Sequence, residues 1–125
     1  MGLENRAPTP QELEQMISIV DQAMKDGALG LSSGLFYVPG SFSTKNEVVE
    51  LAKVASKYGG IYISHMRDEA ALIIESVNET IDIGKLAELP AVITHHKVIG
   101  KSNWGLSKET LKLVDAAVNE GFDVY

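Results

Sequence analysis

Ile61-Tyr62-Ile63-Ser64-His65-Met66-Arg67 is the stretch of sequence that decides the fold, because a close copy of it follows further along the chain. The copy is Val92-Ile93-Thr94-His95-His96-Lys97, and the two matching histidines occupy positions 65 and 95, 30 residues apart. Each copy begins with a short β-branched run, which is typical of a buried strand, and ends in a hydroxyl residue, a histidine and a cation. The segment between the copies is long enough for one crossover helix. We therefore predict two parallel, neighbouring strands whose histidines lie side by side.

The rest of the chain repeats this unit of one strand and one helix. Strands are predicted over residues 28–32, 61–65, 91–95 and 122–125. Helices are predicted between them from apolar periodicity and from start and stop signals, over residues 9–27, 44–59, 68–89 and 107–121. Two of these helices begin with a predicted capping box, Thr9 with Glu12 and Thr44 with Glu47. The pattern predicts an α/β fold with a parallel sheet and right-handed crossovers.

Four such units make about half of a TIM-like (β/α)8 barrel. No linker interrupts residues 1–125, so we expect a single partial barrel segment cut from a longer protein. A complete small flavodoxin-like sheet is the alternative. A parallel sheet needs both faces covered, and an incomplete one leaves edges open, so the isolated segment is expected to self-associate.

Composition limits the classes of partner. The chain has 125 residues, 45% of them hydrophobic, and a formal net charge of −6 without a basic cluster. Nucleic acid and membrane surfaces are therefore not expected as partners. No apolar stretch approaches the roughly 18 residues of a membrane span, and no signal pattern opens the chain, so we expect a cytoplasmic location. The sequence contains no cysteine, which excludes disulfides and thiolate ligands within it.

His65 and His95 are the candidate metal ligands. Each follows an isoleucine by two positions, so we expect Ile63 and Ile93 to point into the barrel, with both histidines one layer above them. His96 has the opposite parity and is expected to face the helices. Neutral imidazole suits zinc, but a catalytic zinc site needs about three protein ligands, and the sequence shows no obvious third. Two structural histidines without a metal are the alternative.

Cations stand directly after both histidine motifs. Arg67 and Lys97 suit an anionic group of a substrate, such as a carboxylate. The alternative is that each pairs with Asp68 or Glu69 at the surface. We interpret these two acids mainly as favourable charge in the first turn of the third predicted helix.

Phe36 and Tyr37 follow the first predicted strand and can form the rim of a pocket, with ordinary packing as the alternative for Phe36. The glycine-rich segment before them, residues 27–34, matches neither a dinucleotide-binding nor a Walker motif, so phosphate binding is disfavoured.

Four stretches together resemble the N-acyl-D-amino-acid deacylases (D-aminoacylases), zinc enzymes of the amidohydrolase superfamily. They are DGALGLSSGLFY at 26–37, SHMRDE at 64–69, THHK at 94–97 and NWG at 103–105, in the family's order. The resemblance implies that His65 and His95 are zinc ligands at the ends of successive barrel strands. It also implies that Tyr37 and Lys97 lie in the substrate pocket near the substrate carboxylate, and that Phe36 helps to form the side-chain pocket.

The family's other machinery has no counterpart in these residues. Its His-x-His pair, its bridging cysteine or similar ligand, and its late-strand aspartate that moves the proton are all missing. The resemblance therefore implies a segment of a zinc-dependent amidohydrolase that cleaves the amide bond of N-acyl-D-amino acids, with no catalytic proton-transfer residue in this segment and no activity of the segment alone. A dihydroorotase-like or hydantoinase-like amidohydrolase, and a metal-free α/β binding module, are the alternatives.

Overall fold

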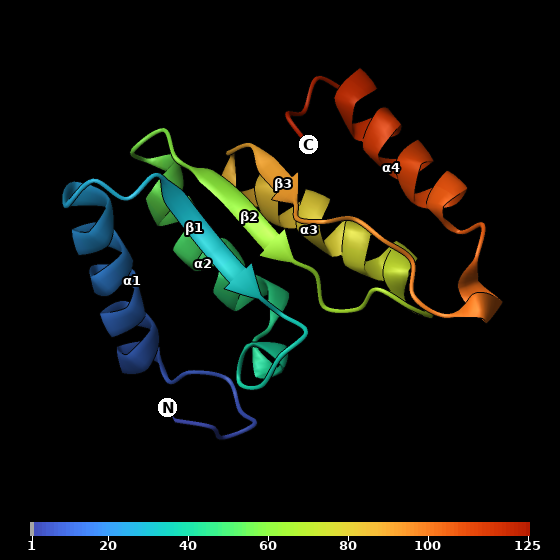
Figure 1. Cartoon of the computed structure of the whole chain (residues 1–125). Coiled ribbons are helices and arrows are strands. Elements are labelled where there is room, and N and C mark those ends of the chain that lie inside the picture. The colour runs from blue at the N-terminus through green and yellow to red at the C-terminus, as the bar shows by residue number, and fades with distance from the viewer. Residues whose placement is uncertain (1) are drawn as a thin grey trace.

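The computed structural model describes residues 2–125. One parallel sheet contains three strands in sequential order, β1 (Gly30–Gly34), β2 (Ile61–His65) and β3 (Ala91–Ile93). The α-helices are α1 (Pro10–Lys25), α2 (Lys45–Ser56), α3 (Ile73–Ala87) and α4 (Ser107–Asn119). Two 3-10 helices, η1 (Gly40–Phe42) and η2 (Lys101–Asn103), lie in the loops. The predicted alternation of helix and strand is confirmed (Figure 1).

The helices cover one face of the sheet. In Figure 1, α2 and α3 lie behind the three strands, with α1 at one side and α4 at the other. Tyr62 and Ser64 of β2 are fully buried towards the helices, whereas Ile61, Ile63 and His65 are only half-buried on the other face. Within residues 2–125 no helix covers that second face, which we call the open face.

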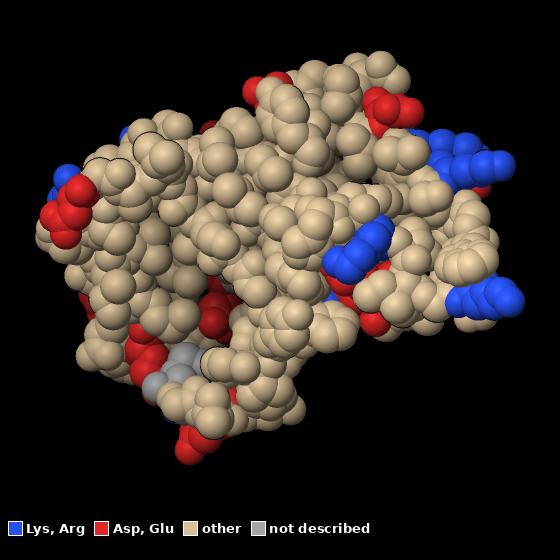
Figure 2. All heavy atoms as spheres, in the orientation of Figure 1, with Lys and Arg blue, Asp and Glu red and all other residues tan. Residues whose placement is uncertain are grey.

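Uncharged side chains occupy most of this open side. Figure 2 has the orientation of Figure 1 and shows acidic groups at its left, lower left and upper edge, basic groups mainly towards its right, and a broad area of other residues between them. None of the described helices is long and apolar enough to span a membrane.

Local capping explains where the first two helices begin. The Thr9 hydroxyl accepts a hydrogen bond from the Glu12 amide, and the Glu12 carboxylate accepts one from the Thr9 amide at 2.8 Å, so the first predicted capping box is confirmed. The Thr44 hydroxyl likewise accepts from the Glu47 amide at 3.2 Å. The Glu47 carboxyl is buried, and its Oε2 atom has no hydrogen-bond partner among residues 2–125.

Helix α3 begins five residues later than its predicted start at Asp68. The Asp68 carboxylate accepts hydrogen bonds from the amides of Ala70 and Leu72, at 2.7 and 2.9 Å, and so stabilises a turn in place of the first helical turn. Glu69 is therefore outside the helix, and the interpretation of this residue as first-turn charge is wrong.

The register of the sheet differs by one residue from the register that the repeated motif predicts. Ser64 of β2 pairs with Ile93 of β3, and Ile63 pairs with Val92. Ile93 therefore lies on the helix-covered side with Ser64, whereas Ile63 lies on the open face. The expectation that Ile63 and Ile93 point the same way is wrong, because burial of Ala91 and Ile93 on the helix side, and not the likeness of the two motifs, sets the register of β3.

The predicted fourth strand is present as a single parallel bridge between Ala91 and Val124. The amide of Tyr125 donates to the carbonyl of Ala91, and the amide of Ile93 donates to the carbonyl of Tyr125. The chain therefore continues the sheet beyond β3 in sequential order.

Candidate metal centre

The two motif histidines meet at the carboxyl ends of neighbouring strands. The imidazole rings of His65 and His95 have centroids 4.5 Å apart and planes inclined at 70°. His65 is the last residue of β2, whereas His95 lies just beyond β3, which ends at Ile93 and not at residue 95 as predicted. The predicted proximity of the two histidines is confirmed, although the predicted register is not.

An unusual backbone conformation of His95 accounts for this meeting. Its φ angle is +43°, in the left-handed region that residues other than glycine rarely adopt. This conformation costs about 1–2 kcal/mol for a residue with a side chain. Regular alternation would place His95 on the helix side with Ile93, so the chain's departure from the strand brings its ring back to His65. Such strained residues are concentrated at functional sites.

Glu69 is the buried carboxylate of this site. Its side chain is only 3% exposed, and its Oε1 atom lies 3.2 Å from His95 Nδ1 and 4.0 Å from His65 Nε2. The turn after Asp68 directs Glu69 towards the strand ends, and its backbone carbonyl accepts a hydrogen bond from the Ile99 amide at 2.6 Å. A buried carboxylate needs compensating charge, and the group around Glu69 supplies it.

Lys97 supplies the positive charge nearest to Glu69. Its ammonium nitrogen lies 2.5 Å from Glu69 Oε1 and 2.9 Å from His95 Nδ1. The Lys97 side chain is 46% exposed, so one end of this ion pair reaches solvent while the other is buried. The alternative that Lys97 pairs with Glu69 is thus realised, but beside the histidines and not at a distant surface.

The donor set of this group fits zinc. His65, Glu69 and His95 each offer a ligand atom, and these atoms lie within 4.8 Å of one another. Zinc binds nitrogen and oxygen ligands at about 2.0–2.2 Å, so ligands of one ion lie roughly 3–4 Å apart, and small side-chain rotations would suffice. Two imidazoles and a carboxylate are a common protein donor set for this metal.

Two aromatic rings border the same histidine. The ring centroids of Tyr37 and Phe36 lie 5.1 and 5.8 Å from that of His65, and the two aromatic rings contact each other edge to face at 5.1 Å. The structure therefore brings together five of the six predicted site residues, His65, His95, Lys97, Tyr37 and Phe36.

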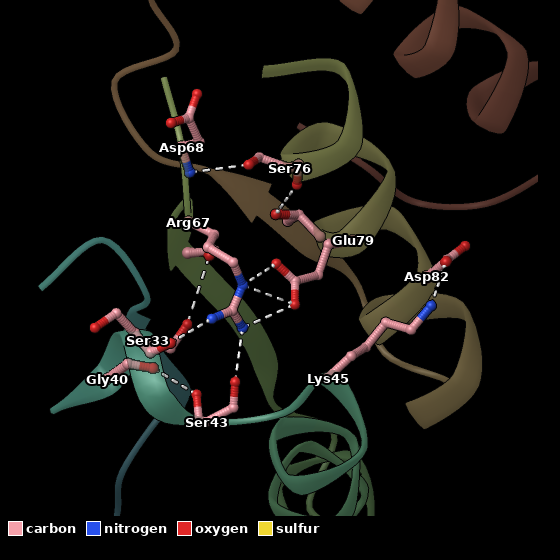
Figure 3. A network of polar contacts seen from close by, with 12 residues as sticks. Ser33, Gly40, Ser43, Lys45, Arg67, Asp68, Ser76, Glu79 and Asp82 are labelled. Carbon is pink, nitrogen blue, oxygen red and sulfur yellow. Dashed lines mark hydrogen bonds and ion pairs between the residues drawn. The ribbon is translucent and has the colours of Figure 1, made fainter. Parts of the chain in front are cut away.

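The sixth predicted site residue, Arg67, has other partners. Its guanidinium donates to the Glu79 carboxylate on α3 and to the carbonyls of Ser41 and Ser43 in the loop after β1 (Figure 3). The ion pair with Glu79 raises the pKa of Arg67 above its usual value. Arg67 thus pairs with neither Asp68 nor Glu69, and the structure directs it towards α3 and the loop.

His96 lies against the helices, as predicted, but for a different reason. Regular alternation after Ile93 would place His96 on the open face, so the left-handed turn at His95 reverses its side as well. Its Nε2 atom is 2.9 Å from the hydroxyl oxygen of Thr110, a fully buried residue of α4. Consecutive histidines thus serve opposite sides of the sheet.

Glu69 is the site residue that sequence reasoning missed. A signal was present, since the SHMRDE motif contains an acid, Glu69, four residues after the histidine at the strand end. Assigning residues 68 and 69 to a helix concealed it, because a first-turn acid needs no further explanation.

The chain is similar to known proteins over nearly its whole length. No family model matches the chain. The chain is 44% identical to D-aminoacylase of Alcaligenes xylosoxydans xylosoxydans over 113 residues, which are 90% of this chain and 23% of that protein. It is 35% identical to N-acyl-D-glutamate deacylase of the same organism over 117 residues, which are 94% of this chain and 24% of that protein.

Solved structures give the same relationship. A crystal structure of D-aminoacylase, which defines a subset of amidohydrolases, matches with a TM-score of 0.94 at 41% identity. N-acyl-D-glutamate deacylase from Bordetella bronchiseptica, complexed with zinc and a phosphonate inhibitor, matches with a TM-score of 0.94 at 35% identity. Each match covers 99% of this chain and 26% of the solved chain. In sequence and in fold, this chain belongs to the N-acyl-D-amino-acid deacylase family of amidohydrolases, and it spans about a quarter of the length of the relatives it matches.

Proposed function

We propose that this chain is the part of a zinc-dependent amidohydrolase that holds the metal and orients the substrate, in an enzyme that cleaves the amide bond of N-acyl-D-amino acids. One observation carries the proposal: His65 and His95 meet at the carboxyl ends of neighbouring parallel strands, with the buried Glu69 between them. In parallel α/β barrels this is the end of the sheet where catalysis takes place.

The sheet is proposed to be part of a closed (β/α)8 barrel, to which residues 1–125 contribute a single segment. Sequential strand order, helices on one side only, and the bridge from Val124 support this. The open face, with Ile63 and His65, would then line the barrel interior. Its mainly uncharged surface suits burial against further strands.

His65 and His95 would hold the zinc ion. Glu69 would contribute as a third ligand or as the acceptor that orients the imidazoles, a role that carboxylates often have beside metal-binding histidines. When bound, zinc supplies a Lewis acid that polarises a carbonyl group and activates water.

Lys97 and Tyr37 are proposed to orient the substrate carboxylate, and Phe36 to contact its side chain. The Lys97 ammonium already lies in a carboxylate pair with Glu69 and reaches solvent, so a second carboxylate can approach it. Tyr37 is 59% exposed as a residue, and its ring contacts His65, which places the hydroxyl, a hydrogen-bond donor, at the rim of the site. No residue of this segment is assigned to proton transfer.

The composition of the chain supports proposals for its partners and its location. A small-molecule N-acyl amino acid is the proposed partner, and the net charge of −6 supports a protein that binds neither nucleic acid nor membranes. A cytoplasmic location and self-association of the isolated chain are proposed with it.

A chimera tests this function. The segment of Alcaligenes D-aminoacylase that aligns with this chain is replaced by these residues, and the purified protein is assayed with N-acetyl derivatives of apolar D-amino acids, D-aspartate and D-glutamate. We expect zinc-dependent release of the free amino acid. Hydrolysis of hydantoin or dihydroorotate instead would favour another amidohydrolase, and a folded chimera that binds no zinc would favour a metal-free module.

A further inference from the structure

The loop of residues 35–43, between β1 and α2, carries two aromatic rings to His65. Phe36 and Tyr37 are 47% and 59% exposed, so burial of their side chains alone does not hold these rings in place. Leu35, by contrast, is 2% exposed, and its amide donates to the carbonyl of His65 at 3.0 Å, which anchors the start of the loop. The far end of the loop needs a separate anchor.

Arg67 provides that second anchor. It comes two residues after His65, and its Nη1 and Nη2 atoms donate to the carbonyls of Ser41 and Ser43, each at 2.9 Å. The Nε and Nη2 atoms donate to the Glu79 carboxylate, also at 2.9 Å. Figure 3 shows the guanidinium between α3 and the loop, with bonds to both.

The guanidinium is well suited to hold a loop. Its donors form a rigid planar fork, so little freedom is lost for each hydrogen bond that it makes. Glu79 is only 15% exposed in its side chain and fixes the orientation of the fork from α3. Charge-assisted bonds of this kind are stronger than bonds between neutral groups.

A short path of hydrogen bonds joins Arg67 to the site. Arg67 bonds the carbonyl of Ser41, and the amide of Ser41 donates at 2.8 Å to the carbonyl of Tyr37. Two successive bonds therefore connect the guanidinium to the backbone of the residue whose ring lies against His65. The end of β2 therefore holds the loop at two places. The carbonyl of His65 bonds its start, at Leu35, and the side chain of Arg67 bonds its far end, at Ser41 and Ser43.

We propose that Arg67 is a positioning residue, which clamps the loop of residues 35–43 to α3 and so presents Tyr37 and Phe36 to the metal centre without touching the substrate. The clamp itself follows from the contacts of this chain, whereas its consequence for catalysis rests on the proposed function. This role differs from the substrate-binding role that the sequence suggests for Arg67.

Hydrogen exchange measures the clamp directly. In the 125-residue chain, Arg67→Met is expected to speed amide exchange in residues 35–43 about tenfold, because opening of the loop loses its charge-assisted bonds. In Arg67→Lys, amide exchange of residues 35–43 is expected to be nearly as fast as in Arg67→Met, since an ammonium group lacks the planar fork that bonds Glu79 and two carbonyls together. The variant Arg67→Met with Glu79→Met removes both charges and controls for an unpaired Glu79.

Lys45 and Asp82 offer a matched control. Their side chains form an ion pair of 2.7 Å between α2 and α3, one helical turn from Glu79, without a bond to the loop. Asp82→Asn is expected to leave exchange in residues 35–43 unchanged. Equal exchange of this loop in the wild type and in both Arg67→Met variants would overturn the proposal.

Kinetics in the chimera separate positioning from substrate contact. Arg67→Met is expected to raise KM by a larger factor than it lowers kcat, by about tenfold. Its effect is expected to be smaller once Tyr37 is replaced by Phe, because part of that effect acts through the hydroxyl of Tyr37. Losses that multiply in the double variant would show that Arg67 acts on the substrate independently and would overturn the proposal. If the parent chimera hydrolyses no substrate, the proposed function fails while the exchange result still decides the clamp.

Discussion

The imidazole rings of His65 and His95 lie 4.5 Å apart, although the sheet register would send their side chains to opposite faces. His95 reaches its partner because its backbone leaves β3 in a left-handed conformation, with φ of +43°. The site therefore depends on one strained residue at a strand end as well as on the parallel pairing of two strands. Strain of this kind persists only where the surrounding structure compensates for it.

Strain at His95 predicts an inverted preference between alanine and glycine. In the middle of a strand, a protein with glycine is less stable than one with alanine by about 0.5–1 kcal/mol. At a left-handed position the order reverses, so we expect His95→Gly to be more stable than His95→Ala by about 1 kcal/mol. Urea unfolding of the two variants measures the difference.

The same pair of substitutions at His65 is the control. His65 is the last residue of a regular strand, so His65→Gly is expected to be less stable than His65→Ala. If glycine were the less stable residue at both positions, the backbone of His95 would not be strained.

Removal of either motif histidine is expected to abolish tight zinc binding by the chimera. His65→Ala and His95→Ala each delete one imidazole ligand, and we expect a loss of at least about 100-fold in zinc affinity, since removal of even an outer-shell partner costs about 10–100-fold. Isothermal titration with zinc measures it. His96→Ala is the matched control, because His96 contacts Thr110 on the other side of the sheet. A similar loss in all three variants would contradict the proposed ligand set.

Glu69→Gln is expected to weaken zinc binding about 10–100-fold. The substitution keeps the size of a buried side chain while removing the charge that faces His95 and His65. The absorption spectrum of the cobalt-substituted chimera separates the two roles, because loss of a ligand changes the coordination geometry and loss of an orienting acceptor does not. Glu75→Gln, an exposed acid in α3, should leave zinc affinity unchanged.

The ion pair between Lys97 and Glu69 predicts a coupled effect on stability. Lys97→Met removes the cation nearest to Glu69, whose side chain is only 3% exposed. We expect a loss of about 1–3 kcal/mol in the free energy of unfolding. Adding Glu69→Gln should recover much of that loss, since the uncompensated charge is then gone. Urea unfolding of the metal-free chain gives both values, and strictly additive losses would show that the two groups do not interact.

Glu47 predicts a dependence of stability on pH. Burial raises the pKa of the Glu47 carboxyl above its usual value, and one of its oxygens has no hydrogen-bond partner in the described part of the chain. The folded state therefore binds more protons than the unfolded state just above the ordinary glutamate pKa. The contribution of Glu47 to stability consequently falls as the pH rises through that window.

Glu47→Gln is accordingly expected to gain more stability relative to the wild type at pH 7 than at pH 4. Thermal unfolding of both chains at the two pH values measures this difference. Glu14→Gln changes an exposed acid of α1 and should show no such gain. If Glu47→Gln changed stability equally at both pH values, ionisation of Glu47 would not destabilise the folded chain.

Local sequence patterns predict most of the secondary structure. The strand predicted over residues 61–65 corresponds to β2 residue for residue, and the capping box at Thr9 begins α1 at Pro10. These predictions succeed because strand preference and helix capping depend on residues a few positions apart. The start of α3 was missed, because the side chain of Asp68 competes with the helix for the amides of Ala70 and Leu72.

By itself, the sequence determined the order of the elements, the parallel sheet, and the placement of His65 and His95 at neighbouring strand ends. Only the tertiary structure decided the register of β2 against β3, the left-handed turn at His95, the burial of Glu69 and the partners of Arg67. The physical reason is range. Elements follow from contacts between near neighbours in the chain, whereas register, burial and ion pairing follow from groups that come together only when separate elements pack.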